Sequence, residues 1–301
     1  LIYCTLCNNL PMDHKSLRQF VHLAETLHFG QAADLCNVSP SALSRSSQRL
    51  EGELDARLLE RNNRSVALTH AGRLFLDYAR DALGDWDAVR NQLRAEAGEL
   101  HGEVCLYCSV TASYSLLFDI LARVRRQHPR IEIKLHTGDP EDAIGRVLTG
   151  AEDIAIAARP RKLHAGLAFR LIDVSPLVFI VSQEHPLTTG GKMATEDWSR
   201  VPMILSERGL ARSRVDRWFR DAGVQPNIYA QVSGNEAIVS MVSLGFGVGV
   251  VPQIVLDNSP LKEGVRVIDV EPGLAPYKVG LVTQEKKCSS PLIGAFWDAL
   301  E

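Results

Sequence analysis

The sequence predicts an α/β protein whose N-terminal part is all-α and carries a winged helix-turn-helix. Three observations lead to this fold class. Residues 31–54 contain two short helical segments joined by a tight turn, residues 69–98 keep a helical repeat of apolar side chains, and strand-like and helical runs alternate after Gly102. We therefore expect a small helical domain, a long connecting helix and a larger α/β domain.

The first helix is predicted from an apolar stripe just after Met12. Leu17, Phe20, Val21, Ala24 and Leu27 recur at the spacing of one buried helical face. This helix gives the two following helices a third to pack on, and three helices form a minimal core.

The next two helices have the layout of a helix-turn-helix. In the stretch QAADLCNVSPSALSRSSQRLEGEL, Ser39 suits the cap of the second helix and Pro40 suits its first position. The helical run then continues without a breaker to Gly52.

The second of these helices has a polar face suited to DNA. Leu43, Ser47, Leu50 and Leu54 share one side of the helical wheel, and hydroxyl, guanidinium and amide groups share the other. Such groups reach phosphates and base edges in the major groove. An ordinary amphipathic surface helix would show the same pattern. The predicted DNA-binding residues are Ser39, Ser41, Ser44, Arg45, Gln48, Arg49, Arg61 and Arg64.

A short hairpin follows this helix. The polar turn Arg61-Asn62-Asn63-Arg64 precedes Val66-Ala67-Leu68, and such an arm can reach a DNA backbone or minor groove. Residues 12–64 hold seven Lys or Arg and seven Asp or Glu, so this module has no net positive charge. Binding must therefore depend on where its arginines lie, although each arginine alone could also be an ordinary solvated side chain.

The helical repeat of residues 69–98 predicts a rod of about 40 Å. A stripe that long cannot be covered by a three-helix module, so a second copy of the chain is its economical cover. A helix folded back on its own domain is the alternative. The predicted dimerisation residues are Phe75, Tyr78, Trp86, Val89 and Leu93.

The remainder of the chain predicts parallel sheets with helices on their faces, arranged as two subdomains. The first set has strands at 103–110, 131–137 and 154–158 and helices at 114–127 and 142–148. The second set has strands at 177–181, 203–205, 228–232 and 248–251 and helices at 214–221 and 236–244, and a last helix spans 292–300.

Hydroxyls and small residues gather where these strands end. Ligands of open parallel sheets lie at the carboxyl ends of strands, where hydroxyl groups and free backbone N–H groups suit a small anion. Helix capping is the plain alternative for each of these residues. The predicted ligand-binding residues are Ser109, Thr111, Ser113, Thr137, Gly138, Ser206, Arg208, Gly234 and Asn235.

Several other classes of protein find no support. Cys105 and Cys108 lie three apart on a predicted strand and point to opposite faces, while Cys4 and Cys7 lie in a leader without companion ligands, so we predict no metal site. The common hydrolase, zinc-protease and phosphate-loop motifs are absent, and Gly245 to Gly249 reads as a backbone turn. No apolar run approaches the ~18–20 residues of a membrane span. Residues 1–11 are interpreted as upstream sequence.

The chain resembles the LysR-type transcriptional regulators. The resemblance covers essentially everything after Met12, although Asp55 and Leu59 stand where the family usually has Gly and Phe. Its most specific residues are Leu17, Phe20, Ala24, Ala32-Ala33, Leu35, Ser39 to Ser44, Leu50-Glu51, Leu58, Arg61, Leu68-Thr69 and Ala71-Gly72.

This resemblance implies a domain plan and partners. The plan is a winged helix-turn-helix DNA-binding domain at 12–69, a linker and dimerisation helix at 70–98, and an effector-binding domain at 103–301 similar to periplasmic solute-binding proteins. Its subdomain I would comprise 103–173 and 277–301 and its subdomain II 174–276. The implied partners are double-stranded operator DNA, a small carboxylate effector, RNA polymerase and further copies of the chain in a dimer or tetramer, with no cofactor and a cytoplasmic location.

Within the family, three segments look most like the activators of branched-chain amino acid synthesis. These are SVTASYS at 109–115, HTGD at 136–139 and GNEAIVSMVSLGFGVGVVP at 234–252. The implied effectors are acetohydroxy acids such as acetolactate. A LysR-type regulator of another pathway, a solute-binding protein and an α/β enzyme are the alternatives.

Overall fold

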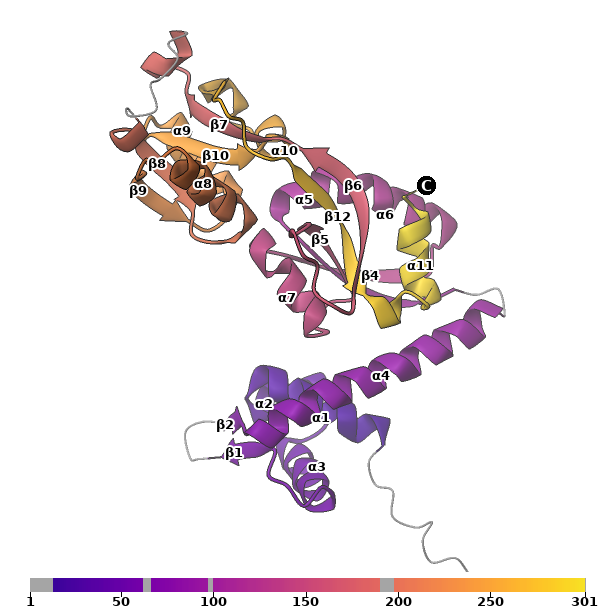
Figure 1. Ribbon diagram of the computed structural model, residues 1–301. Coiled ribbons are helices and arrows are strands. Elements are labelled where there is room, and N and C mark those ends of the chain that lie inside the picture. Colours follow the sequence, from indigo (N-terminus) through magenta and orange to yellow (C-terminus); the bar gives the residue numbers. More distant parts are fainter. Residues whose placement is uncertain (1–12, 62–65, 97–99, 190–197, 301) are drawn as a thin grey trace, which may run out of the picture. The chain divides into compact units, whose positions relative to one another are not determined.

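The computed structural model describes residues 13–61, 66–96, 100–189 and 198–300. The chain forms two compact units, which meet between Leu93 and Arg94 and are described separately. Figure 1 labels the helices and strands of both units.

The first unit begins with three helices, α1 (His14–Thr26), α2 (Phe29–Leu35) and α3 (Pro40–Glu53). The Asp13 carboxylate caps α1 by accepting from the Ser16 N–H at 2.7 Å. The turns between the helices use left-handed residues, Leu27 (φ 50°) and Asn37 (φ 52°), and Asp55 adopts the same conformation after α3 (φ 48°). An Asp tolerates this conformation, so it replaces the usual glycine at the turn.

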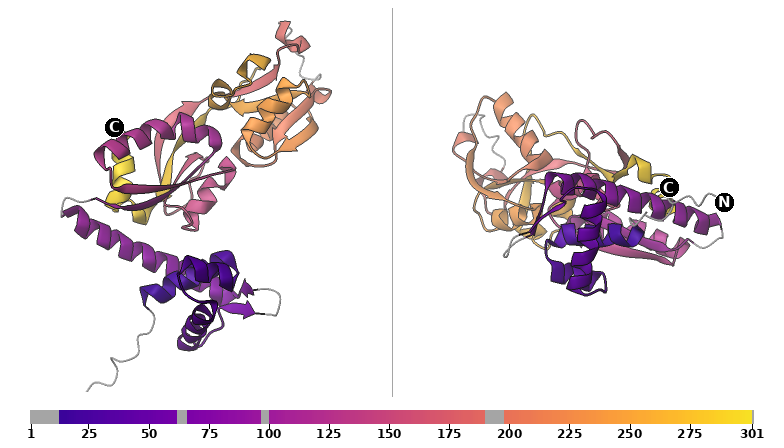
Figure 2. Two further views of the ribbon diagram at one scale, coloured as in Figure 1. Left: turned by 180° about the vertical axis from the view of Figure 1, so that it is seen from behind. Right: turned by 90° about the horizontal axis from the view of Figure 1, so that it is seen from below.

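A hairpin and a long helix complete this unit. β1 (Leu59–Arg61) pairs antiparallel with β2 (Val66–Leu68), and α4 (His70–Glu96) follows. Phe20, Leu23, Leu43 and Leu50 join the start of α4 in one buried core. Within the first unit, Figure 2 shows the beginning of α4 lying against the three short helices.

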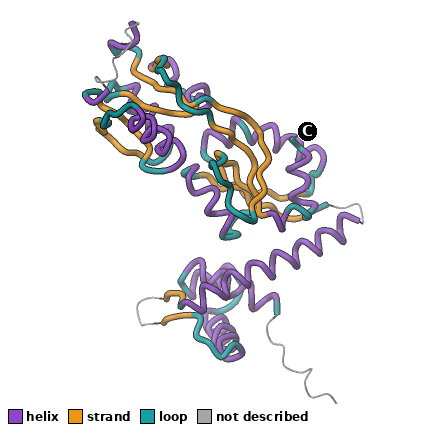
Figure 3. The backbone as a smooth tube through the Cα atoms, in the orientation of Figure 1, coloured by secondary structure: helices purple, strands orange, loops and turns teal. Residues whose placement is uncertain are grey.

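The second unit contains two five-stranded sheets with helices on both faces, as the tube in Figure 3 shows. The strands of the first sheet are β3 (Gly102–Cys108), β4 (Ile131–Thr137), β5 (Ile154–Ala158), β6 (Leu167–Ser175) and β12 (Tyr277–Gln284), in the spatial order β4-β3-β5-β12-β6. β4 and β5 lie parallel to β3, whereas β12 is antiparallel to both β5 and β6. We call this sheet with its helices subdomain I.

The second sheet repeats this plan. Its strands are β7 (Leu177–Ser182), β8 (Pro202–Ser206), β9 (Asn227–Val232), β10 (Val248–Pro252) and β11 (Val265–Ile268), in the order β11-β7-β10-β8-β9. β10, β8 and β9 run parallel, β7 is antiparallel to β10, and β11 at the edge is antiparallel to β7. We call this sheet with its helices subdomain II.

Alternating side chains on the strands face different helices. On β5, Ile154 and Ile156 join the core cluster that contains α6 (Leu117–Gln127) and α11 (Pro291–Asp298), whereas Ala155 and Ala157, together with Tyr107 of β3, pack against α7 (Ala143–Leu148). In the second sheet one face packs on α8 (Gly209–Asp221) and the other on α9 (Asn235–Ser243). Gly249 allows α9 to approach β10 closely, since a Cβ there would lie 2.5 Å from a methyl carbon of Ile238.

The chain passes from the first sheet to the second between Ser175 and Leu177 and returns between Ile268 and Tyr277. The Ser175 hydroxyl accepts from the Ile254 N–H at 3.2 Å, which fixes the start of α10 (Gln253–Asp257) beside the crossing.

The sequence-based prediction needs four corrections. Both sheets are mixed rather than wholly parallel, because the crossing strands return antiparallel. The strands β6, β11 (Val265–Ile268) and β12 and the short helix α10 were not predicted. The predicted strand 103–110 is too long, because Ser109 caps a short helix, α5 (Val110–Ser115), and thereby ends β3 at Cys108. The predicted helix 114–127 is divided between α5 and α6.

Candidate DNA-binding helix and effector-binding site

The sequence folds α3 as predicted for a helix-turn-helix. The Ser39 hydroxyl accepts from the Ala42 N–H at 3.2 Å, and Pro40 occupies the first helical position. Leu43, Ser47 and Leu50 are buried and attach the helix to the core of its unit. The opposite face of α3 is therefore left to solvent.

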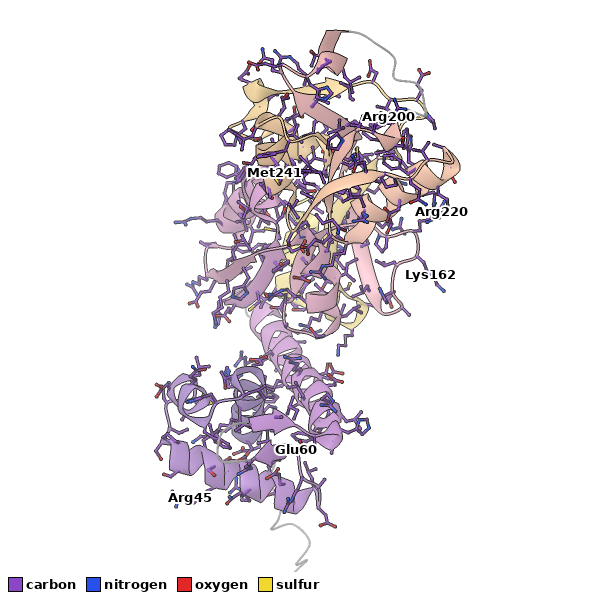
Figure 4. All side chains as sticks on the ribbon, turned by 90° about the vertical axis from the view of Figure 1, so that its left-hand side faces the viewer. Arg45, Glu60, Lys162, Arg200, Arg220 and Met241 are labelled. Carbon is purple, nitrogen blue, oxygen red and sulfur yellow. The ribbon has the colours of Figure 1, made fainter. Side chains whose placement is uncertain are left out.

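The exposed face carries most of the residues predicted to bind DNA. Exposed residues are Ser39, Ser41, Arg45, Gln48 and Arg49, and Ser44 is half-buried. Arg49 forms an ion pair with Glu53 at 3.6 Å. Neither Arg45 nor Gln48 bonds to another described side chain, so both are available to a ligand. Figure 4 shows Arg45 projecting from the outer side of α3.

Arg61 is not part of this exposed face, and its guanidinium already binds other side chains of the same unit. Its Nη2 donates to the Ser47 hydroxyl at 3.0 Å and to Glu51 Oε2 at 2.8 Å, and its guanidinium lies 5.2 Å from the centre of the Phe29 ring. These contacts join the hairpin to α2 and α3. Arg64 lies outside the described residues.

The residues predicted for dimerisation divide between core and surface. Phe75 is 9% exposed and packs edge-on against Phe20 in the core, with ring centres 5.0 Å apart. Tyr78, Trp86, Val89 and Leu93 are exposed, and Leu74 on the same helix is exposed too. The structure therefore leaves an apolar stripe on α4 without Phe75.

In the second unit, most predicted effector-binding residues lie at strand ends that face the other sheet. Ser109 and Thr111 follow β3, and Thr137 and Gly138 follow β4. Ser206 ends β8, and Gly234 precedes α9. Hydrogen bonds of Thr111 to Glu236 and of Arg208 to Asp139 join the two sheets beside these residues, so both sheets contribute to one site.

The predicted residues of subdomain I differ in their exposure and in whether they already have hydrogen-bond partners within the protein. Ser109 accepts from the Ala112 N–H, and the Ser113 hydroxyl donates to the Val110 carbonyl at 2.6 Å, so both serve α5 itself. Thr111 is 2% exposed, and its hydroxyl donates to Glu236 Oε1 at 2.6 Å. Thr137 and Gly138 are exposed.

The residues of subdomain II meet acidic side chains of subdomain I. Arg208 Nη2 lies 3.1 Å from Asp139 Oδ2 and 2.8 Å from Asp142 Oδ1, and the Ser233 hydroxyl donates to Asp139 Oδ2 at 3.0 Å. Ser206, Gly234 and Asn235 line a small cavity of about 10 Å³ beside these contacts. Side chains of the protein itself therefore already bond to one another across this site.

Glu141 provides a further contact between the sheets. Both of its carboxylate oxygens lie 3.3 Å from the Leu210 N–H, in the first turn of α8. Gly209 permits this approach, because a Cβ there would overlap the carboxylate, and its φ of 95° suits glycine. Burial raises the pKa of the Glu141 carboxyl, which the bond to the Leu210 N–H partly opposes.

Sequence reasoning missed the acidic members of this site. Asp139, Glu141, Asp142 and Glu236 were not among the predicted residues, although all four follow strand ends where ligands were expected. The signal available in the sequence was the acidic run Asp139-Pro140-Glu141-Asp142 directly after β4. The prediction considered only groups that donate hydrogen bonds to an anion, and carboxylates accept them.

Metal and membrane features can be stated for the described part of the chain. There, no three His, Cys, Asp or Glu side chains are arranged to hold a metal ion, and Cys36, Cys105, Cys108 and Cys288 are free thiols. None of the described helices combines the length and apolar character needed to cross a bilayer.

Two family models match the chain and together cover nearly all of it. The model for a bacterial regulatory helix-turn-helix protein of the lysR family matches residues 14–73, and the model for the LysR substrate binding domain matches residues 97–301.

The chain is also similar to named regulators. It is 42% identical over 293 residues to the transcriptional activator IlvY of Salmonella typhimurium, an alignment covering 96% of this chain and 99% of that protein. Against IlvY of Haemophilus influenzae, identity is 39% over 294 residues, covering 96% and 100% of the two chains. These relatives are named as regulators, not as enzymes.

Solved structures share the fold. A full-length OxyR variant from Pseudomonas aeruginosa superposes with a TM-score of 0.72 at 24% identity, covering 96% of this chain and 94% of that one. Full-length CbnR in complex with its target DNA gives 0.63 at 24% identity, covering 96% and 99%. The predicted fold class, a winged helix-turn-helix followed by a two-subdomain α/β domain, is thus confirmed, and the chain belongs to the LysR family of bacterial helix-turn-helix transcriptional regulators.

Proposed function

We propose that the chain is an activator that binds operator DNA through α3 and responds to a small organic acid bound between the two sheets of its second unit. The proposed effectors are acetohydroxy acids such as acetolactate, and the proposed target is a gene of branched-chain amino acid biosynthesis. The observation that carries this proposal is the 42% identity to IlvY activators over nearly the whole length of both chains.

The exposed face of α3 supports the DNA-binding role. Arg45, Gln48 and Ser41 offer a guanidinium, an amide and a hydroxyl, which are the groups that bind base edges and phosphates. Leu43 and Leu50 hold the opposite face in the core, so these donors are presented on a fixed helix. This arrangement fits insertion of α3 into a major groove.

The site between the sheets supports the acid-binding role. Thr111, Thr137, Ser233 and Arg208 bring hydroxyl groups and a guanidinium to one region. A carboxylate prefers such donors. An acetohydroxy acid also has hydroxyl and keto oxygens that further hydroxyl groups would bind.

The exposed stripe on α4 supports the proposed assembly. Tyr78, Trp86, Val89 and Leu93 favour a homodimer through paired α4 helices, and dimers would pair into tetramers as the family usually does. RNA polymerase is the proposed partner in activation, and the cytoplasm the proposed location.

The proposed target gene is the one for the isomeroreductase that consumes acetohydroxy acids. The test uses the full chain and the promoter of that gene from its own genome. We expect a footprint on that promoter and an increase in transcription with acetolactate but not with valine at the same concentration. Thr137→Val should raise the acetolactate midpoint about 10- to 100-fold at an unchanged footprint, because a ligand oxygen loses its donor.

Thr149→Val is the matched control, since its hydroxyl donates to Gly145 and Arg146 of its own helix. A footprint without any response to acetolactate would refute the proposed effector. The absence of a footprint would refute the proposed target.

A further inference from the structure

Donor groups assigned to the effector already bind carboxylates of the protein itself. Thr111 of subdomain I binds Glu236 of subdomain II, and Arg208 and Ser233 of subdomain II bind Asp139 of subdomain I. Each of these contacts joins the two sheets. A carboxylate that arrives from solution must therefore compete with a carboxylate already in place.

The contact between Thr111 and Glu236 is the best defined of these. Glu236 Oε1 accepts from the Thr111 hydroxyl at 2.6 Å and from the Thr111 backbone N–H at 3.3 Å. Thr111 is 2% exposed, so its hydroxyl lies inside the protein. A buried hydroxyl without an acceptor is costly, and this donor is therefore always expected to hold one.

Glu236 differs from Thr111 because it is exposed. Its carboxylate reaches the buried hydroxyl with one oxygen and faces solvent otherwise. Turning away from Thr111 would return the carboxylate to water, which solvates a charged group well. The exchange of Glu236 for another carboxylate therefore costs little on the side of Glu236 and leaves Thr111 satisfied.

We propose that Glu236 is an internal ligand of Thr111, which a small organic acid displaces when it binds. The identity of that acid rests on the proposed function, whereas the displacement does not. The acid's carboxylate would take the two donors of Thr111, and Glu236 would move into solvent. Binding would then break a contact between the sheets as it forms a contact to the ligand.

The first test uses acetate as the probe, because it reproduces the end of the Glu236 side chain. Acetate binding to the full-length protein is measured by ligand-observed NMR at constant ionic strength. In Glu236→Ala the competing carboxylate is gone, and we expect acetate to bind at least about 10-fold more tightly than to the parent chain. The double variant Glu236→Ala, Thr111→Val should lose this gain.

Glu132→Ala is the control, because it removes an exposed carboxylate at the start of β4, at the other end of the strand from Thr137, that makes no bond to Thr111. It should bind acetate like the parent chain. Equal affinity in Glu236→Ala and the parent chain, or a gain that survives Thr111→Val, would overturn the proposal. Circular dichroism checks the fold, and if Glu236→Ala is unfolded, Glu236→Gln is used for the same comparison with an expected gain of at least about threefold.

A second arm separates this proposal from the proposed effector. Acetolactate is titrated into the parent chain and Glu236→Ala under the same conditions. If Glu236→Ala binds acetate more tightly than the parent chain does but neither protein binds acetolactate, the proposal that Glu236 is an internal ligand is supported and the proposed effector is wrong. If both bind acetolactate with the same affinity, the effector stands and the internal ligand is wrong.

Discussion

Glu51 should be the main polar support of the DNA-binding unit. Its Oε1 accepts from the backbone N–H groups of Leu58 and Leu59, at 2.9 and 3.0 Å, and its Oε2 accepts from Arg61 Nη2 at 2.8 Å. Leu58 and Leu59 are 2% and 3% exposed, and the Glu51 side chain is 15% exposed. One carboxylate therefore connects α3, the hairpin and the turn between them.

The expected cost of Glu51→Ala follows from these contacts. Two N–H groups at buried residues would lose their acceptor, at about 1–2 kcal/mol each when water partly replaces it. We expect a loss of about 2–4 kcal/mol in the free energy of unfolding of this unit. Arg61→Ala leaves both N–H groups bonded to Glu51, so it should cost only about 1 kcal/mol.

Hydrogen exchange followed by mass spectrometry measures this loss in the full chain. A peptide from α1 contains none of the altered groups, and its exchange through unfolding of the unit should accelerate roughly 30- to 1000-fold in Glu51→Ala. Glu53→Ala is the control, because Glu53 pairs only with the exposed Arg49 among described side chains. A change below threefold in Glu51→Ala, or a larger one in Arg61→Ala, would refute the reasoning.

Three further predictions concern the other surfaces of the molecule. Arg45→Ala should weaken operator binding by about 1–3 kcal/mol at fixed salt. The control Arg220→Ala, on the exposed side of α8, should not weaken it. If Arg45→Ala binds the operator as tightly as the parent chain, the proposed role of α3 is wrong. Trp86→Glu should weaken the dimer at least about 100-fold in sedimentation equilibrium, because an unpaired charge would enter an apolar seam, and an intact dimer would exclude α4 as that seam. Burial raises the pKa of Glu141 above its ordinary 4.5, so the folded state holds this proton to higher pH than the unfolded state does. The folded state therefore loses stability as pH rises from about 4.5 through the raised pKa. Over this pH window the melting temperature of Glu141→Gln should rise relative to that of the parent chain, and a difference that stays constant with pH would contradict the shift.

Local signals in the sequence were sufficient for most of the fold. Ser39 and Pro40 define the start of α3 by capping chemistry that acts within a few residues. The stripe after Met12 likewise predicts a buried helical face: Leu17, Phe20 and Ala24 are buried and Val21 is half-buried, whereas Leu27 ends the helix and is exposed. The strand β6 was missed because its residues alternate poorly and its pairing with β12 joins segments about a hundred residues apart in the sequence.

The candidate sites were less accessible to sequence reasoning, since their contacts are long-range. Arg61 has the chemistry of a DNA ligand, and only the folded chain shows Glu51 and Ser47 around its guanidinium. In the same way, a Thr and a Glu that are 125 positions apart give no joint signal in one sequence, although Thr111 alone was predicted as part of a site. Residue type thus indicated which side chains bind ligands, but not whether the protein already supplies the ligand.

Displacement of the Glu236 carboxylate by an effector would change how the two sheets are held relative to each other. The described chain passes between the two sheets at two places, beside Pro176 and between Ile268 and Tyr277, so their relative position depends on these connections and on contacts such as the one from Thr111 to Glu236. A ligand that bound to Thr111 without removing Glu236 would have no differential effect on that position. A ligand that replaces Glu236 removes one of these contacts, and it favours arrangements of the sheets in which the contact is absent. The free energy available for this shift cannot exceed the difference in ligand affinity between the two arrangements, so the affinity gained in Glu236→Ala measures how strongly the internal carboxylate couples the site to the second sheet.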